Sequence, residues 1–360
     1  MEVVAETLAT GLAEGRPVVV LTSTASPSPV PRREVLGNLE VRRLRTVEFA
    51  HTAFMPALAL HLLRLPRDVV LHVHIAVAYA PEMVWLVSRL RRQRYVAHFH
   101  LDVDPSGPLG PLFLLYKRFV LGAVLRGAAR VIAVSPDQPE LLQRIHGVDP
   151  SRITLIPNGV APQFYWTGRR PPDPSRAFRL LAVGRLAPQK NLSLLLRAVS
   201  LMRQPVEVRI VGDGEERSML QAQIDDLRLR NVELCGAKSG EALVQAYRWA
   251  DAFVLTSVKE STGLVLLEAF AAGLPVVATD APGVRHTVGA DGILVPPDAE
   301  RLAEALDRLV SDPDAWATWA SRSSARARQH PWSPQLTALE DLYDRVYGGP
   351  EPESEREPTS

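Results

Sequence analysis

Two glutamates, Glu260 and Glu268, lie eight positions apart in the segment VKESTGLVLLEAFAAGLPVVATD. A strand-like run, DAFVLTS, leads into the polar turn VKEST, and an apolar helical pattern then ends at Gly273 before a second strand-like run. We therefore expect Glu260 in a loop and Glu268 inside a helix, both facing the carboxyl ends of a parallel sheet, where ligands of such folds bind. A carboxylate in an apolar helix needs a partner, which favours a functional role.

The start of this helix is suited to hold an anion. Backbone N–H groups around Thr262, Gly263 and Leu264 lack helical partners there, and the helix dipole favours a phosphate. Taken singly, Glu260 would more often be a solvated loop residue, and Glu268 could pair with a neighbouring arginine as part of the packing. The combination with the glycine and the flanking strands favours a ligand site.

A second candidate is the run GRLAPQKN, in which a strand ends at Gly184 and a turn carries Arg185 and Lys190 ahead of a leucine-rich helix. A forked guanidinium and an ammonium in such a loop could neutralise a diphosphate. For one arginine and one lysine alone, two solvated surface cations are the simpler interpretation. The pair Gly212 and Gly214 in VGDGEERSML is a weaker signal, because a tight strand-to-helix turn also uses glycines.

Histidines form a third candidate. HVHIA contains His72 and His74, and AHFHLDVDPSG contains His98, His100 and Asp102. Alternate spacing on a strand puts His98 and His100 on one face, which could suggest a metal site. A polar wall at a strand exit explains the same spacing as readily, so no metal is expected. His100 ends a strand before a polar loop and is the better functional candidate, whereas His98 is expected to pack.

The composition is that of an ordinary globular protein. The chain has 360 residues, 46% of them hydrophobic and 22% charged, which is enough for two domains. A net charge of +1 gives no reason to expect a nucleic-acid partner. The single cysteine, Cys235, excludes an intrachain disulfide and a cysteine-based metal site. No apolar run reaches the roughly 20 residues of a membrane span, and no signal peptide is indicated, so a cytoplasmic location is expected.

Strand-like and helix-like segments alternate along the chain, which predicts parallel sheets with helices on both faces. The Pro- and Arg-rich run 167–177 suits a linker between two doubly wound domains. The amphipathic run 335–348 predicts a C-terminal helix, and the polar, Pro-rich residues 349–360 are expected to be disordered. The expected strands are 17–23, 39–44, 69–75, 95–101, 129–135, 153–158, 178–184, 206–212, 231–236, 251–257, 275–280 and 292–297.

The run from Glu260 to Glu268 resembles the E-x7-E signature of retaining GT-B glycosyltransferases, specifically glycosyltransferase family four, the group-one type. Four further runs resemble family segments in the family's order, and together they extend the resemblance over nearly the whole chain. A departure lies at Thr262, where many members carry an aromatic residue. The four runs are IPNGV (156–160), VGRLAPQKNLSLLLRAV (183–199), VGDGEERSMLQ (211–221) and LPVVATDAPGVRHTV (274–288).

The resemblance implies a GT-B fold, in which two doubly wound, Rossmann-like α/β domains with parallel sheets face each other across a cleft. The N-terminal acceptor-binding domain would span 1–166, with the helix 333–348 crossing back to it. A linker at 167–177 would lead to the C-terminal nucleotide-sugar-binding domain, 178–332. The usual first strand and glycine-rich loop of the first domain have no counterpart in this sequence.

Residue roles follow from the resemblance. Arg185 and Lys190 would hold the diphosphate of the donor, Glu268 the ribose hydroxyls and Glu260 the sugar hydroxyls. The glycine segment at Gly212 and Gly214 would lie near the nucleotide base. The amides at Thr262, Gly263 and Leu264 would assist the phosphates, and His100 and Asp102 would lie on the acceptor side. His100, Glu260, Arg185 and Lys190 are the expected catalytic set.

The implied activity is the metal-independent, retaining transfer of a hexosyl group from a UDP- or GDP-sugar to a glycan, lipid-linked or small-molecule acceptor in bacterial glycoconjugate synthesis. No cofactor other than the donor substrate is expected. One alternative is a non-catalytic or impaired homologue that binds sugar nucleotides. A less favoured alternative is a sugar-nucleotide epimerase of the same fold, because the E-x7-E spacing and the GR…K loop follow the transferase pattern.

The N-terminus departs from the resembled family. The chain opens MEVVAETLATGLAEG, with helical spacing from the first residues and no strand ahead of it. Either the true start lies upstream of Met1, or the chain is a variant with impaired activity. We favour the first, because loss of a central parallel strand would expose apolar surface and unpaired backbone groups.

The resemblance also admits a peripheral position on the cytoplasmic face of the inner membrane. Six arginines are candidates for contact with anionic lipid, although such clusters are more often solvated faces. They are Arg42, Arg43, Arg45, Arg91, Arg92 and Arg94.

Overall fold

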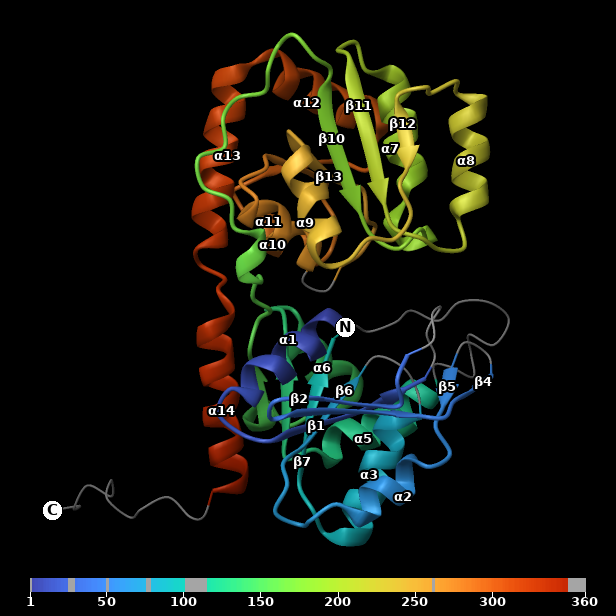
Figure 1. Ribbon diagram of the computed structural model, residues 1–360, viewed down its shortest axis with the longest axis vertical. Helices are drawn as coiled ribbons and strands as arrows, with labels where there is room; N and C mark the ends of the chain where they lie inside the picture. The colour runs from blue at the N-terminus through green and yellow to red at the C-terminus, as the bar shows by residue number, and fades with distance from the viewer. Residues whose placement is uncertain are drawn as a thin grey trace, which may run out of the picture. The chain divides into compact units, whose positions relative to one another are not determined.

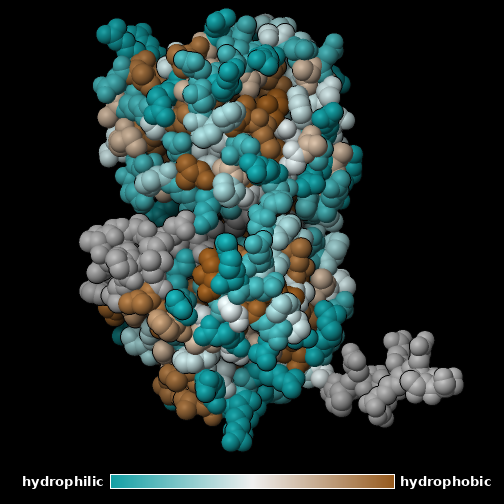
Figure 2. Space-filling model, turned by 180° about the vertical axis from the view of Figure 1, so that it is seen from behind, coloured by the Kyte–Doolittle hydropathy of each residue, from teal (hydrophilic) through white to brown (hydrophobic). Residues whose placement is uncertain are grey.

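The protein is represented by a computed structural model that describes residues 2–24, 30–49, 52–75, 79–100, 115–260 and 263–348. The chain divides into two compact units (Figure 1). Unit 1 contains residues 1–157 and 333–360, and unit 2 contains residues 158–332. On the face seen in Figure 2, hydrophilic residues predominate in both units and apolar side chains are scattered among them.

Unit 2 is built on a six-stranded sheet with the order β12-β11-β10-β13-β14-β15, in which every pairing is parallel. After β10, the chain adds β11 and β12 on one side of it. The chain then returns to the other side of β10 and adds β13, β14 and β15 there. The order therefore reverses between β10 and β13, as in the common Rossmann order 3-2-1-4-5-6. The strands are β10 (Phe178–Val183), β11 (Val206–Val211), β12 (Val232–Leu234), β13 (Ala252–Leu255), β14 (Val276–Thr279) and β15 (Ile293–Val295).

Helices cover both faces of this sheet, which explains why its central strands are apolar on both sides. One face packs against α7 (Leu192–Leu201), α8 (Arg217–Asp226), α12 (Ala299–Ser311) and α13 (Pro313–Ala327). The other packs against α9 (Gly240–Trp249), α10 (Leu264–Ala271) and α11 (Val284–Val288). The short turns η3 (Pro162–Phe164) and η4 (Pro188–Lys190) complete the unit.

Unit 1 contains a parallel four-stranded sheet with the order β6-β7-β8-β9. Its strands are β6 (Leu71–Ile75), β7 (Tyr95–Phe99), β8 (Arg130–Ala133) and β9 (Ile153–Leu155). Alternate residues of β6 and β7 point into a hydrophobic core on one face of the sheet. That core includes side chains from α2 (Leu58–Arg64), α3 (Ala80–Arg91), α5 (Gly122–Gly127) and α6 (Gln138–His146). A π-helical segment, η1 (Lys117–Leu121), leads directly into α5, and the short 3-10 helix η2 (Pro150–Arg152) precedes β9.

A separate three-stranded sheet in unit 1 has the order β1-β3-β2. β1 (Val18–Ser23) and β3 (Leu39–Leu44) pair in parallel, as expected, but β2 (Arg33–Leu36) pairs antiparallel with β3. The sequence pattern indicates neither β2 nor the hairpin of β4 (Val47–Phe49) and β5 (Thr52–Phe54). Within the described ranges no strand joins β1 to β6, so each lies at the edge of its own sheet.

The C-terminal helix α14 (Trp332–Tyr347) belongs to unit 1 from Ser333 onward. Gly11 of α1 (Glu2–Ala13) lies against Leu336, where an added Cβ would come within 2.5 Å of the leucine side chain. Arg16 pairs with Glu340 at 3.3 Å. The helix that the sequence predicts at 335–348 therefore packs on the N-terminal helix of the chain, whereas residues 349–360 lie outside the described part.

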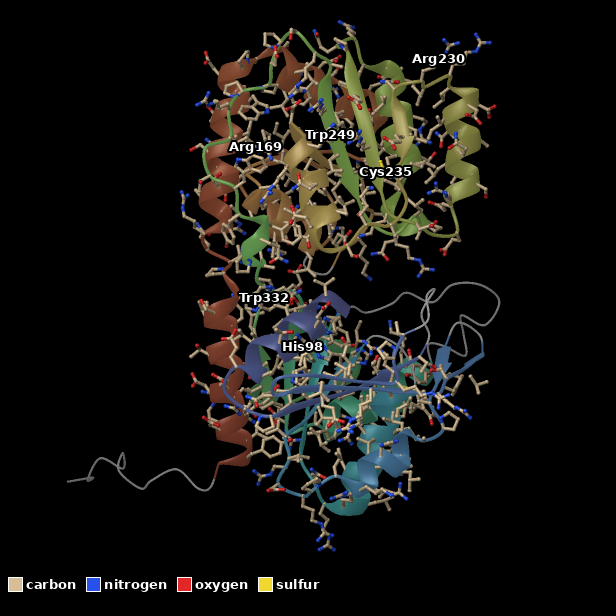
Figure 3. The ribbon with its side chains drawn as sticks, viewed as in Figure 1. His98, Arg169, Arg230, Cys235, Trp249 and Trp332 are labelled. Atoms are coloured by element: carbon tan, nitrogen blue, oxygen red, sulfur yellow. The ribbon has the colours of Figure 1, made fainter. Side chains whose placement is uncertain are left out.

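The boundary between the units differs from the expected linker at 167–177, because residues from Asn158 onward cluster with unit 2. The guanidinium of Arg169, seen in Figure 3, donates to the carbonyls of Tyr247, Ala250 and Ala272. The guanidinium of Arg176 binds both carboxylate oxygens of Asp251. In the sequence, a run rich in proline and arginine indicates a linker. In the structure, Arg169 and Arg176 bind this run to unit 2.

In the described ranges, none of the helices is long and apolar enough to cross a membrane.

Candidate functional site

Lys190 and Glu260 form an ion pair in unit 2. Lys190 ends the turn after β10, and Glu260 lies in the loop after β13, so the pair joins the two strands at which the sheet order reverses. The side chains are 18% and 9% exposed. Ser257 Oγ also donates to Glu260 Oε1 at 2.7 Å. The geometry places a shielded ammonium and carboxylate at the crevice where parallel sheets of this order bind ligands.

Backbone and side-chain bonds between the two loops hold this pair in place. Val258 N donates to the carbonyl of Gln189 at 2.9 Å, and Gln189 Nε2 donates to the carbonyl of Lys259 at 2.7 Å. Thr256 Oγ1 donates to the carbonyl of Lys190 at 2.9 Å. Because the loops are joined on both sides of the ion pair, its position follows from the pairing of β10 with β13.

Gly212 and Gly214 allow a close approach between two loops. A Cβ on Gly212 would lie 1.8 Å from the carbonyl oxygen of Gly184, and one on Gly214 would lie 2.4 Å from that of Leu186. Leu186 N donates to the carbonyl of Asp213 at 2.9 Å. The glycine pair therefore lets the loop after β11 lie directly against the loop that carries Arg185 and Lys190.

Arg185 does not lie in the Lys190–Glu260 pair. Its guanidinium binds Glu215 Oε2 at 2.8 Å, and the two side chains are 70% and 56% exposed. An ion pair this exposed contributes little to stability. Arg185 can therefore leave Glu215 for another anion at small cost.

Helix α10 begins after Gly263, whose positive φ of +50° favours glycine. A Cβ there would also lie 2.9 Å from the side chain of Leu266. Leu264 is the first residue of the helix, as the sequence predicts. Thr262 lies outside the described residues.

Glu268 is buried within α10, with 7% of its surface exposed. The sequence left open a neighbouring arginine as the partner of Glu268. Among the described residues the partner is instead Tyr247 of α9, whose Oη donates to Glu268 Oε2 at 2.6 Å. Burial raises the pKa of Glu268 to about 7, and the bond from Tyr247 offsets only part of this effect. Tyr247 was not among the residues predicted from the sequence. The one sequence signal for such a residue was that a buried carboxylate must have a partner.

Four histidines lie together on one face of the unit 1 sheet. His98 stacks on His100 with ring centroids 4.5 Å apart and on His74 at 5.0 Å, and its place in the unit is seen in Figure 3. Ring nitrogens of His74 and His100 are 2.7 Å apart, and those of His72 and His98 are 3.1 Å apart. The expected packing of His98 agrees with its 3% exposure.

The histidines are held mainly in their neutral form. Burial and the neighbouring His74 lower the pKa of His100 to about 2, and burial lowers that of His74 to about 4. One nitrogen each from His72, His74 and His98 lies within 4.8 Å of the others, a spacing from which an ion could be held. His72 bonds His98 and Tyr343 Oη, and His74 bonds His100, so the cluster has an alternative role as a hydrogen-bonded network. Among the described residues His98 Nε2 has no hydrogen-bond partner.

His100 follows β7, and Gln138 Nε2 donates to its carbonyl at 2.9 Å. A neutral imidazole at this position can give or accept a hydrogen bond but is not a cation at neutral pH. Asp102, the other residue predicted for the acceptor side, lies outside the described residues. His100 belongs to unit 1, whereas Lys190, Glu260 and Glu268 belong to unit 2.

Several of the arginines considered for lipid contact have partners inside the protein. Arg42 binds Glu40 at 2.8 Å, and Arg43 binds Glu34 at 2.9 Å. Arg91 donates to the carbonyl of Leu62 at 2.9 Å. These three have structural roles that the sequence pattern did not reveal.

Both halves of the chain match known protein families. A profile of the family described as Glycosyl transferases group 1 matches residues 169–328, and one described as Glycosyltransferase Family 4 matches residues 1–164. The D-inositol 3-phosphate glycosyltransferase of Pseudarthrobacter chlorophenolicus is 32% identical over 232 residues, which are 58% of this chain and 54% of that protein. That of Frankia alni is 34% identical over 236 residues, 58% of this chain and 57% of that protein. The chain thus matches little more than half the length of these relatives.

Solved structures share the fold. Sucrose-phosphate synthase from Thermosynechococcus elongatus superposes with a TM-score of 0.76 at 22% identity, over 96% of this chain and 93% of that one. HepE from Anabaena, in complex with UDP-glucose, gives a TM-score of 0.70 at 23% identity, over 85% of this chain and 86% of that one. Two α/β units with parallel sheets, and family matches on both halves, show that the chain belongs to the GT-B glycosyltransferases of the family 4 and group 1 type.

Proposed function

We propose that the protein transfers a hexosyl group from a nucleotide-diphosphate sugar to a hydroxyl of a carbohydrate, lipid-linked or small-molecule acceptor, with retention of the anomeric configuration and without a metal ion. The observation that carries this proposal is the shielded Lys190–Glu260 pair at the reversal of strand order in unit 2. Family membership on both halves of the chain supports it.

In this proposal Lys190 binds the donor diphosphate, and Glu260 accepts hydrogen bonds from hydroxyls of the sugar. An ammonium has three N–H donors, so Lys190 can bind a phosphate oxygen while it remains bonded to Glu260. Glu260 would orient Lys190 before the donor arrives. Charge that develops on the leaving phosphate would then meet a cation that needs no reorganisation.

Arg185 would leave Glu215 and bind the diphosphate, at small cost because the existing pair is exposed. Amides at the start of α10, next to Gly263, would assist the phosphates. Glu268 would accept hydrogen bonds from the ribose hydroxyls, and its raised pKa makes that interaction stronger above pH 7 than below it. The loop at Gly212 and Gly214 would border the nucleotide base.

In the transfer step the bond between the anomeric carbon and the donor phosphate breaks, and the acceptor oxygen bonds to the same carbon from the same face. The acceptor proton passes to the leaving phosphate, so that a free nucleoside diphosphate is released. His100 would contact the transferred sugar or the acceptor as a neutral imidazole, in keeping with its low pKa.

The test is release of nucleoside diphosphate by the purified full chain, with UDP-glucose and GDP-sugars as donors. UDP-glucose comes first because HepE has been solved with it, and an inositol phosphate belongs among the acceptors because the inositol-phosphate transferases are relatives. We expect release that depends on acceptor, and its loss in Lys190→Ala and Glu260→Ala. Lys238→Ala, an exposed lysine of unit 2, is the matched control and should retain activity.

Full activity in Lys190→Ala or Glu260→Ala would refute the assigned site. Donor binding without turnover under every acceptor condition would favour a sugar-nucleotide-binding homologue instead.

A further inference from the structure

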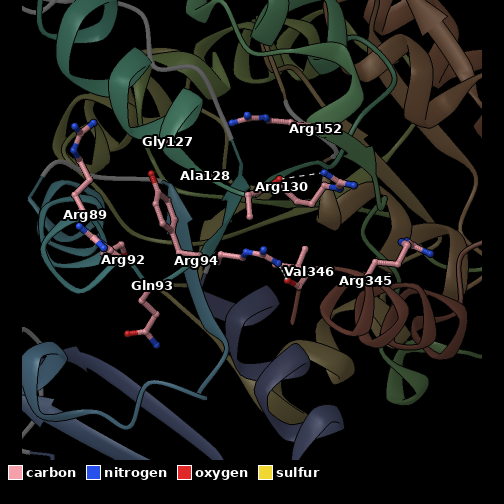
Figure 4. A pocket seen from close by; sticks show the side chains of 13 residues that line it. Arg89, Arg92, Gln93, Arg94, Gly127, Ala128, Arg130, Arg152, Arg345 and Val346 are labelled. Atoms are coloured by element: carbon pink, nitrogen blue, oxygen red, sulfur yellow. Dashed lines mark hydrogen bonds between the residues drawn. The ribbon is translucent and has the colours of Figure 1, made fainter. Parts of the chain in front are cut away.

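A pocket of about 460 Å³ lies in unit 1, away from the carboxyl ends of its strands (Figure 4). It is formed where α3 and α14 end and where β7 and β8 begin. No aspartate or glutamate is among its lining residues, which all belong to the described part of the chain. Six of the lining residues are arginines, namely Arg89, Arg92, Arg94, Arg130, Arg152 and Arg345.

None of these six arginines has an ion pair with an acidic residue among the described residues, whereas four other arginines of unit 1, such as Arg42, do. Arg94 donates to the carbonyl of Val346 at 2.6 Å, and Arg130 to that of Ala129 at 3.3 Å. Arg152 donates to a carbonyl, and Arg89 lies over the Trp85 ring at 5.6 Å. The protein as a whole carries only +1, so the positive charge of the pocket is a local imbalance.

A purely structural explanation is that these arginines neutralise helix ends. Arg89 lies in the last turn of α3 and Arg345 in the last turn of α14, where cations are favoured. Each helix end carries roughly half a negative charge, so two ends offset about one of the six positive charges. Most of the positive charge therefore remains, and it favours an anion over a cation or a neutral ligand in this pocket.

The pocket also contains a hydroxyl without a partner. Ser88 lines it and is 3% exposed, and its Oγ has no hydrogen-bond partner among the described residues. That hydroxyl has less than 1 Å² of exposed surface, so the side-chain groups available to a ligand are chiefly guanidinium N–H groups. Arginine forks bind the oxygens of a phosphate in pairs.

We infer that this pocket binds a small polyanion carrying two or more phosphate groups. Its volume lies in the range of small-ligand sites. The site belongs to unit 1 and shares no residue with the proposed donor site, so the inference does not rest on the proposed function. A free oligophosphate and a phosphorylated lipid headgroup present the same chemistry to it.

The experiment measures binding of inorganic tripolyphosphate to the full chain by calorimetry at low salt. The variant Arg92→Gln/Arg345→Gln removes two exposed arginines whose side chains make no hydrogen bond or ion pair with the described residues, so folding should be preserved. The control Arg67→Gln/Arg144→Gln removes two exposed arginines elsewhere in unit 1 and has the same net charge. We expect tripolyphosphate binding to weaken about tenfold in the pocket variant and to change less than about twofold in the control.

Because tripolyphosphate could also occupy the donor site, the measurement is repeated in Lys190→Ala. Binding that survives Lys190→Ala and is lost in the pocket variant supports the inference. Equal weakening in the pocket variant and the control would mean unspecific attraction, and loss in Lys190→Ala alone would assign the anion to unit 2; either result overturns it.

A second arm uses vesicles that contain cardiolipin, whose headgroup carries two phosphates, with phosphatidylcholine vesicles as the neutral reference. If the control sediments with the anionic vesicles and the pocket variant does not, the inference is supported with a lipid headgroup as the source. Tripolyphosphate binding without vesicle binding supports it with a free oligophosphate. Failure of wild-type protein to bind either probe refutes it.

Discussion

The hydroxyl of Tyr247 donates a 2.6 Å hydrogen bond to Oε2 of Glu268, and the two side chains are buried between α9 and α10 of unit 2. A neutral donor, rather than a cation, is therefore the described partner of this carboxylate. This explains why the pKa of Glu268 stays high despite a good hydrogen bond.

The contribution of Glu268 to the stability of the protein should fall as pH rises through the titration of this residue. Its pKa is about 7 in the fold and 4.5 as an ordinary glutamate, so the folded state holds the proton more tightly between these values. The contribution is fully present below pH 4.5 and lost as pH rises through 7, with a total of roughly 3 kcal/mol. Glu268→Gln, which stays neutral, should gain stability relative to the wild type as pH rises from 5 to 8. The measurement is the difference between their denaturation midpoints, because the buried histidines contribute the same opposite slope to both proteins. An unchanged slope in Glu268→Gln would contradict the assignment.

The Lys190–Glu260 pair should show strong coupling in a double-mutant cycle. Lys190→Met or Glu260→Gln alone leaves a shielded charge without its partner, whereas the double variant leaves none. We expect each single variant to be less stable than the double one, with a coupling of about 1.5 kcal/mol or more. Urea denaturation of the four proteins measures it. Additive effects would mean that the two groups do not interact in solution.

Replacement of Gly212 by alanine should displace the loop that carries Lys190. The added Cβ would meet the backbone oxygen of Gly184 at 1.8 Å, which a rigid, hydrogen-bonded strand end cannot avoid by a side-chain rotation. We expect a loss of roughly 2 kcal/mol or more and weaker nucleotide binding. Gly15→Ala, whose nearest neighbour would be 3.9 Å away, is the control and should change the melting temperature little.

Arg169 should matter far more to stability than the adjacent Arg170. Arg169 satisfies three backbone carbonyls of unit 2, whereas Arg170 is exposed. Arg169→Met should cost roughly 2–4 kcal/mol, because the buried carbonyls lose their donors. Arg170→Met should be close to neutral. Similar melting temperatures for the two variants would show that the run 167–177 behaves as a linker.

Much of the fold was predictable because it depends on local periodicity. The apolar strands and their intervening helices in both halves are found where the sequence places them, since continuous apolar runs and amphipathic helices suit a parallel sheet covered on both faces. The strand β2 was missed because REVL is short, polar and mostly exposed. Its pairing with β3 depends on neighbours and not on its own pattern.

For the site, the sequence predicts only which residue types lie at the ends of strands. The contact between Lys190 and Glu260 requires the adjacency of β10 and β13, which sequence spacing does not give without a fold. The Arg185–Glu215 pair and the role of Tyr247 depend on side-chain directions across separate elements. The pocket arginines come from four separate segments of the chain, so no local pattern could have joined all of them.

Unit 2 is, in terms of chain order, an insertion within unit 1, because residues from Ser333 onward return to the first unit. During synthesis the ribosome therefore completes all of unit 2 before it delivers the helix that packs on Gly11 and bonds His72 through Tyr343. Until then the histidine face of β6 and β7 lacks that contact. Domains that are continuous in sequence can fold as they emerge. We thus expect unit 2 to gain protease resistance first, and unit 1 to mature only after α14 has left the exit tunnel.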